Sequence, residues 1–193
     1  MLKALFAGLA LLLLAGIANA QVPAGNVFFG YSYYSADLSP YNNANNSTRN
    51  NTNGFEASLE GRIIPFLGFV ADFDGHYGSQ NILPPVCPTA LPPGCGPFTF
   101  NTNFTENNYL FGPRVSFPVG RIRPFAEAFF GVARVHGGEI NPDTSFAIAV
   151  GGGLDYRIIK PIAWRFQGDY VQTRFFSATQ NNVRISTGIV LRF

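Results

Sequence analysis

The feature that most constrains this chain is an alternation of apolar and charged residues that recurs from Val27 to the last residue. In one segment Glu56 and Glu60 occupy one parity, while Phe55 and Leu59 occupy the other. Successive side chains of a strand point to opposite faces, so each such segment predicts a strand with one apolar and one charged face. The predicted strands cover residues 26–36, 55–63, 67–77, 106–117, 124–135, 145–157, 164–170 and 183–193.

The charged face indicates which kind of β-protein these strands build. Soluble sandwiches and barrels turn the apolar face inward, whereas a membrane barrel turns it toward lipid and encloses a polar lumen. Full charges recur on one parity, opposite large rings and aliphatic side chains. After the first residues, no apolar run approaches the ~20 residues of a spanning helix. We therefore expect an all-β fold, a transmembrane antiparallel up-and-down β-barrel of about eight strands.

The side chains of the charged parity are expected to share the lumen. An eight-stranded barrel has an interior that side chains can just fill. The inward acids and arginines are nearly balanced in number, and an unpaired buried charge costs far more than a paired one. We expect an ion-pair network that plugs the lumen, formed by Glu56, Glu60, Arg62, Asp72, Asp74, His76, Arg114, Glu127, Asp155, Arg157, Arg165, Asp169, Arg184 and Arg192.

The connections between the predicted strands alternate in length. Three are short and contain Pro65, Pro124 or Pro161, whereas the others, near 37–53, 78–104, 136–144 and 175–182, are longer and rich in polar residues, Gly and Pro. Short turns on one side and long loops on the other are typical of outer-membrane barrels, whose short turns face the periplasm. Pro113 lies inside a predicted strand and lacks an N–H, so we expect a bulge or a frayed register there.

The amino-terminal residues have the pattern of an export signal. Lys3 supplies a positive charge, an apolar run covers 5–17, and Ala18-Asn19-Ala20 is a small-x-small cleavage pattern. We expect residues 1–20 to be a signal peptide and residues 21–193 to form the barrel, located in the bacterial cell outer membrane. An uncleaved anchor is the alternative.

Cys87 and Cys95 lie close together in a Pro-rich segment of the second long connection. In an exported protein, an even pair across a short loop predicts a disulfide. A metal site is the alternative, but neither His76 nor His136 stands at ligand spacing to the pair. We therefore expect a disulfide, no metal site and no cofactor.

Three stretches resemble those of a known family: Arg123–Val132, Gly151–Arg157 and the last strand, Gly188–Phe193. The chain resembles the OmpA-like eight-stranded outer-membrane β-barrel domain. The resemblance implies contact with outer-membrane lipid and lipopolysaccharide, and an assembly signal ending in Phe193 that the barrel assembly machinery reads. Members of the family include structural anchors, narrow pores, adhesins and lipid-modifying enzymes. Many relatives carry a peptidoglycan-binding domain after the barrel, whereas this sequence stops at Phe193.

Few residues could support catalysis. His76 with Ser79, and His136 with Glu139, are not spaced to share one face of a strand. The formal charge of +2 falls to +1 without Lys3, which gives no reason to expect a nucleic-acid partner. We expect a protein without catalytic activity that has a structural or narrow, weakly conducting role. An adhesin-like module that binds surface ligands through its outer loops is the alternative, and a lipid A-modifying enzyme comes third.

Arg134 and Arg174 have the parity of the lipid-facing residues at the outer ends of their predicted strands. A charge on the lipid face costs least near the interface, and guanidinium groups suit phosphate oxygens. The two arginines are candidates for contact with lipopolysaccharide phosphates. The alternative is that both strands have ended and the side chains project into water.

Overall fold

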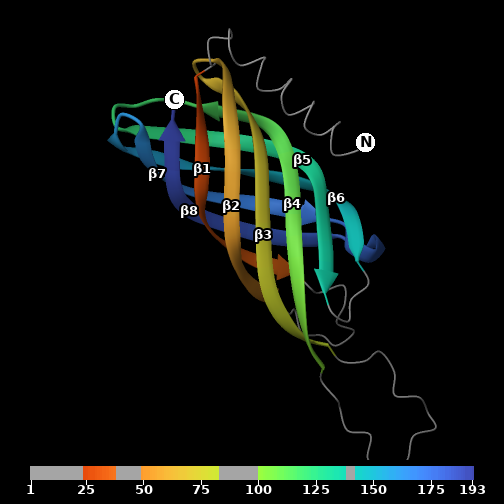
Figure 1. Ribbon diagram of the computed structural model, residues 1–193. Helices are drawn as coiled ribbons and strands as arrows, with labels where there is room; N and C mark the ends of the chain where they lie inside the picture. Colours follow the sequence, from red (N-terminus) through yellow and green to blue (C-terminus); the bar gives the residue numbers. More distant parts are fainter. Residues whose placement is uncertain (1–23, 38–48, 83–99, 138–141) are drawn as a thin grey trace, which may run out of the picture.

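The computed structural model describes residues 24–37, 49–82, 100–137 and 142–193, which form one closed, antiparallel barrel (Figure 1). Each strand pairs with the next in sequence, and the last strand pairs with the first. No helix in these residues is long and apolar enough to cross a bilayer. The strands are β1 (Gly25–Asp37), β2 (Arg49–Ile64), β3 (Leu67–Ile82), β4 (Phe100–Ser116), β5 (Ile122–Gly137), β6 (Asp143–Ile159), β7 (Ile162–Thr173) and β8 (Gln180–Arg192), with a short 3-10 turn, η2 (Phe175–Ser177), between β7 and β8.

The predicted eight-stranded, up-and-down barrel is confirmed. Its seam joins the two ends of the described chain, since Gly25 N donates to Phe193 O at 3.0 Å and Phe193 N donates to Gly25 O at 3.1 Å. Along the same seam, Tyr34 of β1 lies opposite Arg184 of β8. The closed order leaves no sheet edge unpaired, which a strand structure inside lipid requires.

The two faces of the wall have the polarity of a membrane barrel. Outward-facing rings are strongly exposed, with 63% of Phe29 and 60% of Phe146 accessible, whereas Glu56 and Arg184 are fully buried inside. In a soluble barrel this distribution would be reversed. The alternation predicted from sequence is therefore confirmed as apolar side chains outside and charged side chains within.

The described strands extend beyond the predicted ones at the long-loop end. β4 begins at Phe100, so the segment assigned to the 78–104 connection is partly strand. Here Gly78 lies opposite Phe104, and Ser79 lies opposite Asn103. Backbone hydrogen bonds form whatever the polarity of the side chains, so a polar sequence outside the membrane can continue a ladder without apolar alternation.

Of the two alternatives expected at Pro113, the structure shows the frayed pairing and no bulge. Phe111 pairs with Phe130 and Arg114 with Glu127 in one unbroken register, and only the two intervening β4–β5 pairs are missing. On the β3 side Pro113 still lies opposite Phe69. The absent N–H therefore opens the ladder locally on the β5 side without inserting a residue.

The register shifts lie instead at two of the short turns, after Arg62 in β2 and after Arg157 in β6. Between β4 and β5, Gly120 has a φ of 63°, a left-handed conformation that favours glycine. These turns make the short end of the barrel, which corresponds to the periplasmic side in outer-membrane proteins. The predicted signal peptide and the predicted Cys87–Cys95 disulfide both lie outside the described residues.

Candidate functional site

Arg184 of β8 lies at the centre of the most densely charged part of the lumen. Its Nε and Nη2 donate to Asp169 Oδ2 at 3.0 and 2.8 Å, and its Nη1 donates to Asp72 Oδ2 at 2.7 Å and to Asp74. Glu56 Oε2 lies 3.6 Å from Nε. One guanidinium therefore joins carboxylates from β2, β3 and β7. We call Arg184 with these four acids the Arg184 cluster.

Uncharged polar groups complete the surroundings of this cluster. Gln167 Nε2 donates to Glu56 Oε1 at 2.6 Å, and Asn108 Nδ2 donates to Asp74 Oδ1 at 2.7 Å. Gln167 and Asn108 are fully buried. Four carboxylates around one guanidinium leave this part of the lumen rich in acid, although each acid has at least one polar neighbour.

A second group of ion pairs lies nearer the short turns. Arg114 Nε donates to Glu127 Oε2 at 2.5 Å, and its Nη1 donates to Glu60 Oε2 at 3.1 Å. Arg165 binds Asp155 through two parallel hydrogen bonds of 2.7 and 3.1 Å. Such two-point contacts between arginine and carboxylate fix geometry as well as charge. We call these five residues the inner ion pairs.

Two phenylalanines on the lumen side of β5 pack against the inner ion pairs. The guanidinium carbons of Arg114 and Arg165 each lie 4.7 Å from the centre of the Phe125 ring. The guanidinium carbon of Arg114 also lies 5.9 Å from the centre of the Phe129 ring. The faces of aromatic rings attract cations, so apolar rings on the inward parity are compatible with a charged lumen.

The lumen also contains an apolar cluster that reaches from the level of the inner ion pairs to the long-loop end, where buried polar side chains such as Glu106 and Asn182 also lie. Side chains from β1, β3, β4, β5, β6 and β7 meet there with residue Phe175 of η2, and all are buried. The lumen is therefore not polar throughout, as the charge pattern suggested, because apolar side chains are mixed with polar ones along its length. The cluster consists of Tyr34, Ala36, Val70, Phe104, Leu110, Phe129, Ala133, Val135, Ala147, Ala149, Val171 and Phe175.

His76 has the partners of a nucleophilic triad but not its setting. Its Nε2 lies 2.9 Å from Ser32 Oγ, and its Nδ1 lies 3.0 Å from Asp74 Oδ1. Nδ1 does not reach hydrogen-bond geometry with that carboxylate, and Asp74 also binds Arg184. All three side chains are fully buried, and Tyr34 stacks on the imidazole at 4.5 Å. A substrate has no path to Ser32 in this arrangement, which packs side chains together rather than exposing a nucleophile.

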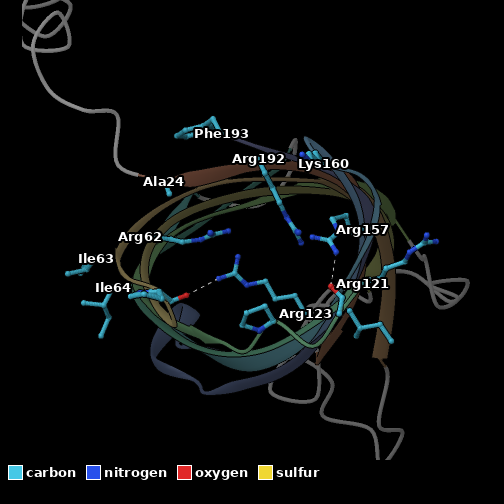
Figure 2. Close-up of a pocket in the computed structure, with 14 residues that line it drawn as sticks. Ala24, Arg62, Ile63, Ile64, Arg121, Arg123, Arg157, Lys160, Arg192 and Phe193 are labelled. Atoms are coloured by element: carbon cyan, nitrogen blue, oxygen red, sulfur yellow. Dashed lines mark hydrogen bonds between the residues drawn. The ribbon is translucent and has the colours of Figure 1, made fainter.

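Three of the predicted network arginines lie at the short-turn end (Figure 2). Arg192 Nη2 donates to Asp155 Oδ2 at 3.2 Å, and Arg62 Nε lies 3.8 Å from Glu60 Oε1. Placing Arg157 among the buried ion pairs was wrong, because its side chain is exposed and donates to the Gly120 carbonyl at 2.9 Å. Its parity is inward, but β6 reaches the end of the barrel at this point.

Arg134 and Arg174 are both exposed at the long-loop end. Arg134 of β5 lies opposite Thr144 of β6, and the Arg174 N–H donates to Ser145 Oγ at 3.2 Å. The two arginines therefore flank the first residues of β6 from either side. This brings both candidates for lipid contact to one sector of the outer rim.

Sequence reasoning missed two charged residues of the interior. Glu106 is buried and accepts a hydrogen bond of 2.8 Å from the Tyr34 hydroxyl. Arg123 is only 7% exposed and donates to Ser116 Oγ at 2.9 Å. Glu106 shares its parity with Arg114 and already lies in the predicted strand 106–117, so the alternation could have identified it, whereas Arg123 stands one residue before the predicted strand 124–135.

No family model and no curated protein matches the chain. Solved structures match it in fold. Neisserial surface protein A superposes with a TM-score of 0.64 at 14% identity, covering 88% of this chain and 97% of that protein. The outer membrane protein OprG from Pseudomonas aeruginosa gives 0.56 at 7% identity, with coverages of 89% and 96%. Ail, the attachment invasion locus protein of Yersinia pestis, solved with the heparin analogue sucrose octasulfate, gives 0.53 at 11% identity, with coverages of 88% and 99%.

The chain has the fold of the bacterial outer-membrane barrels. Together with its apolar exterior and charged interior, this places the protein in the outer membrane. At these identities the likeness concerns the fold alone. The OmpA-like resemblance agrees with it at that level, and no family match narrows it further.

Proposed function

We propose that this protein is a structural element of the outer membrane whose lumen is closed to solutes and that presents its long loops at the cell surface. The observation that carries the proposal is the Arg184 cluster, which ties three other strands to β8 across the middle of the lumen. The inner ion pairs form a further layer below it, and the apolar cluster fills space alongside both. An eight-stranded interior has no room for a channel beside such layers.

Recordings from the purified, refolded protein in planar bilayers test this proposal. The wild-type barrel should show no conductance, or only small, brief events. Glu60→Ala removes the acceptor of both Asn26 and Arg114 inside the barrel, so we expect more frequent events from this variant. Arg49→Ala, at the outer rim, serves as the matched control and should behave like the wild type. Large, steady openings from the wild-type protein would overturn the proposal.

Anchoring to lipopolysaccharide is part of the same proposal. Arg134 and Arg174 flank one sector of the outer rim, both exposed, and guanidinium groups bind phosphate oxygens through paired hydrogen bonds. We expect the double variant Arg134→Gln/Arg174→Gln to retain less lipopolysaccharide during purification than the wild type. Equal retention would mean that both side chains project into water.

Surface binding is the second candidate function. The β3–β4 hairpin continues as paired strand from Gly78 and Phe104 to Ile82 and Phe100, well beyond the ~9–11 residues that span a bilayer. The paired ladder therefore extends past the part of the wall that spans the bilayer. Since Ail was solved with a heparin analogue, immobilised heparin is a suitable probe. Saturable binding by the intact protein would favour this candidate, and turnover of radiolabelled lipid A would favour an enzyme instead.

A further inference from the structure

The short-turn end of the barrel contains a cavity of about 650 Å³. Its lining includes six cationic side chains and no Asp or Glu. This is unlike the lumen above it, where each buried guanidinium contacts carboxylates. We call the cavity the basic mouth, and its cations are Arg62, Arg121, Arg123, Arg157, Lys160 and Arg192.

Four of these arginines converge although they come from different strands. Figure 2 shows Arg62, Arg123, Arg157 and Arg192 directed into the mouth, from β2, β5, β6 and β8, whereas Arg121 points away from it. Their positions are fixed by the wall, because each stands within two residues of the end of its strand. The mouth is therefore preorganised to bring several guanidinium groups toward one ligand.

The chain provides little negative charge to balance these groups. Arg123 donates to Ser116 Oγ and, at 3.3 Å, to the Pro65 carbonyl, while Arg157 donates to the Gly120 carbonyl. Within the described ranges, neither has a carboxylate within 4.0 Å. Both donate hydrogen bonds only to neutral oxygens among the described residues, so the chain does not neutralise their charges.

The other two converging arginines share acids that are already bound. Glu60 pairs with Arg114 at 3.1 Å, and Asp155 pairs with Arg165 at 2.7 Å. Arg62 and Arg192 are therefore second cations on acids that already have a partner. The Nε atoms of Arg62 and Arg192 are buried and have no hydrogen-bond partner in the described chain. The rest of each side chain is partly exposed, 23% for Arg62 and 16% for Arg192, at the edge of a cavity large enough to hold a small ligand.

We infer that the basic mouth is a binding site for a phosphate group. A phosphate presents several oxygens at once and can accept hydrogen bonds from guanidinium groups on different strands, which match it in charge and geometry. Free phosphate and the phosphodiester of an anionic phospholipid headgroup share this chemistry. The positive charge of the mouth suits both sources equally. Ile63 and Phe193 are exposed beside the mouth, at the level where the apolar exterior ends.

Binding to the refolded, full-length barrel in detergent micelles tests the inference with two probes. Inorganic phosphate is titrated by calorimetry, and phosphatidylglycerol is counted by native mass spectrometry, with phosphatidylcholine as the uncharged reference. Saturable binding of phosphate alone identifies a soluble ligand. Binding of phosphatidylglycerol in preference to phosphatidylcholine identifies a lipid headgroup. Absence of saturable binding in both arms overturns the inference.

Matched variants assign the site. Arg157→Gln removes an exposed arginine that donates to a backbone carbonyl, so the barrel should fold, and affinity should fall about tenfold, the worth of one charge-assisted hydrogen bond. Arg49→Gln is the control, because Arg49 is also exposed and also donates to backbone carbonyls, at the opposite end of the barrel. The double variant Arg123→Gln/Arg157→Gln should lose binding altogether. Equal affinity of the two single variants would place any bound anion elsewhere.

Discussion

The Arg184 cluster and the basic mouth are two ends of one charged interior with opposite excess charge. The cluster sets a single guanidinium among four carboxylates, whereas the mouth sets four converging guanidiniums beside two carboxylates that already bind other arginines. Over the whole lumen the numbers of acidic and basic side chains are nearly equal, but acidic side chains predominate around Arg184 and basic ones predominate at the mouth. The difference teaches that overall charge balance does not determine local pairing. Where the charged side chains share a buried partner the lumen is filled, and where the cations lack a carboxylate partner it opens into a cavity.

The largest effect should follow the loss of Arg184. Arg184→Ala leaves four buried carboxylates without their shared cation, and removing one partner of a buried ion pair costs about 3–5 kcal/mol. We expect the free energy of unfolding, measured by urea titration of the refolded barrel, to fall by about that amount.

Arg157→Ala at the mouth is the matched comparison for Arg184→Ala. Its side chain is exposed and has no carboxylate partner in the described chain, so the free energy of unfolding should change by no more than ~0.5 kcal/mol. A similar loss of unfolding free energy in both variants would mean that the barrel depends on the charge of Arg157 as much as on that of Arg184.

A smaller effect is expected where a glycine makes room for the cluster. A Cβ at Gly151 would lie 2.0 Å from Asp169 Oδ1 and 2.3 Å from the Gly168 carbonyl, so Gly151→Ala must displace an acid that binds Arg184. Overpacking of this kind costs about 1–3 kcal/mol. At Gly61 no atom lies within 4 Å of the corresponding Cβ, and Gly61→Ala should be nearly neutral. Chemical unfolding of both variants checks the expectation, which equal losses would contradict.

Chemical accessibility should separate the two regions without changing stability. The folded barrel treated with phenylglyoxal should be modified at Arg157, which is exposed, and protected at Arg184, which is fully buried. A fluorophosphonate should likewise leave Ser32 unlabelled, because the hydroxyl beside His76 is sealed in the lumen. Peptide mass spectrometry reads both reactions. Labelling of Ser32 in the folded protein would reopen the enzyme hypothesis.

The smallest effect is expected outside both regions. If Cys87 and Cys95 form the predicted disulfide, it closes a short loop in the connection between β3 and β4, apart from the hydrogen-bonded wall. Cys87→Ser/Cys95→Ser should therefore leave the free energy of barrel unfolding unchanged within ~0.5 kcal/mol. Thiol titration of the unreduced, denatured wild-type protein should find no free thiols, and two free thiols would contradict the pairing.

The sequence was sufficient to predict which face each charge occupies. Glu56, Asp72, Asp169 and Arg184 were placed inside by parity alone, and all four are buried in the lumen. This works because a strand has a period of two, and a slip of one residue would carry every charge of a strand into lipid. The same rule fixed the number of strands and their antiparallel order.

Parity could not predict which charges meet across the barrel. Arg184 and Asp72 are 112 positions apart, and their contact depends on strand tilt and stagger, which alternation does not encode. Arg157 shows the same limit, because its parity is inward while its height on the wall leaves it in water. The segregation of charge along the axis follows from these heights, so it became visible only in the structure.

The contacts of Arg184 also bear on the order in which the barrel can be assembled. Its acids lie on β2, β3 and β7, and its own strand is the last to be made and the one that closes against β1. In an open sheet, β8 can pair with β7 and bring Arg184 to Asp169, but Glu56, Asp72 and Asp74 lack this cation until the β1–β8 seam forms. Because contacts so distant in sequence form slowly, neutralisation of the lumen and sealing of the wall are expected to occur in one late, cooperative step. Arg184 would then destabilise half-closed barrels, in addition to closing the lumen to solutes.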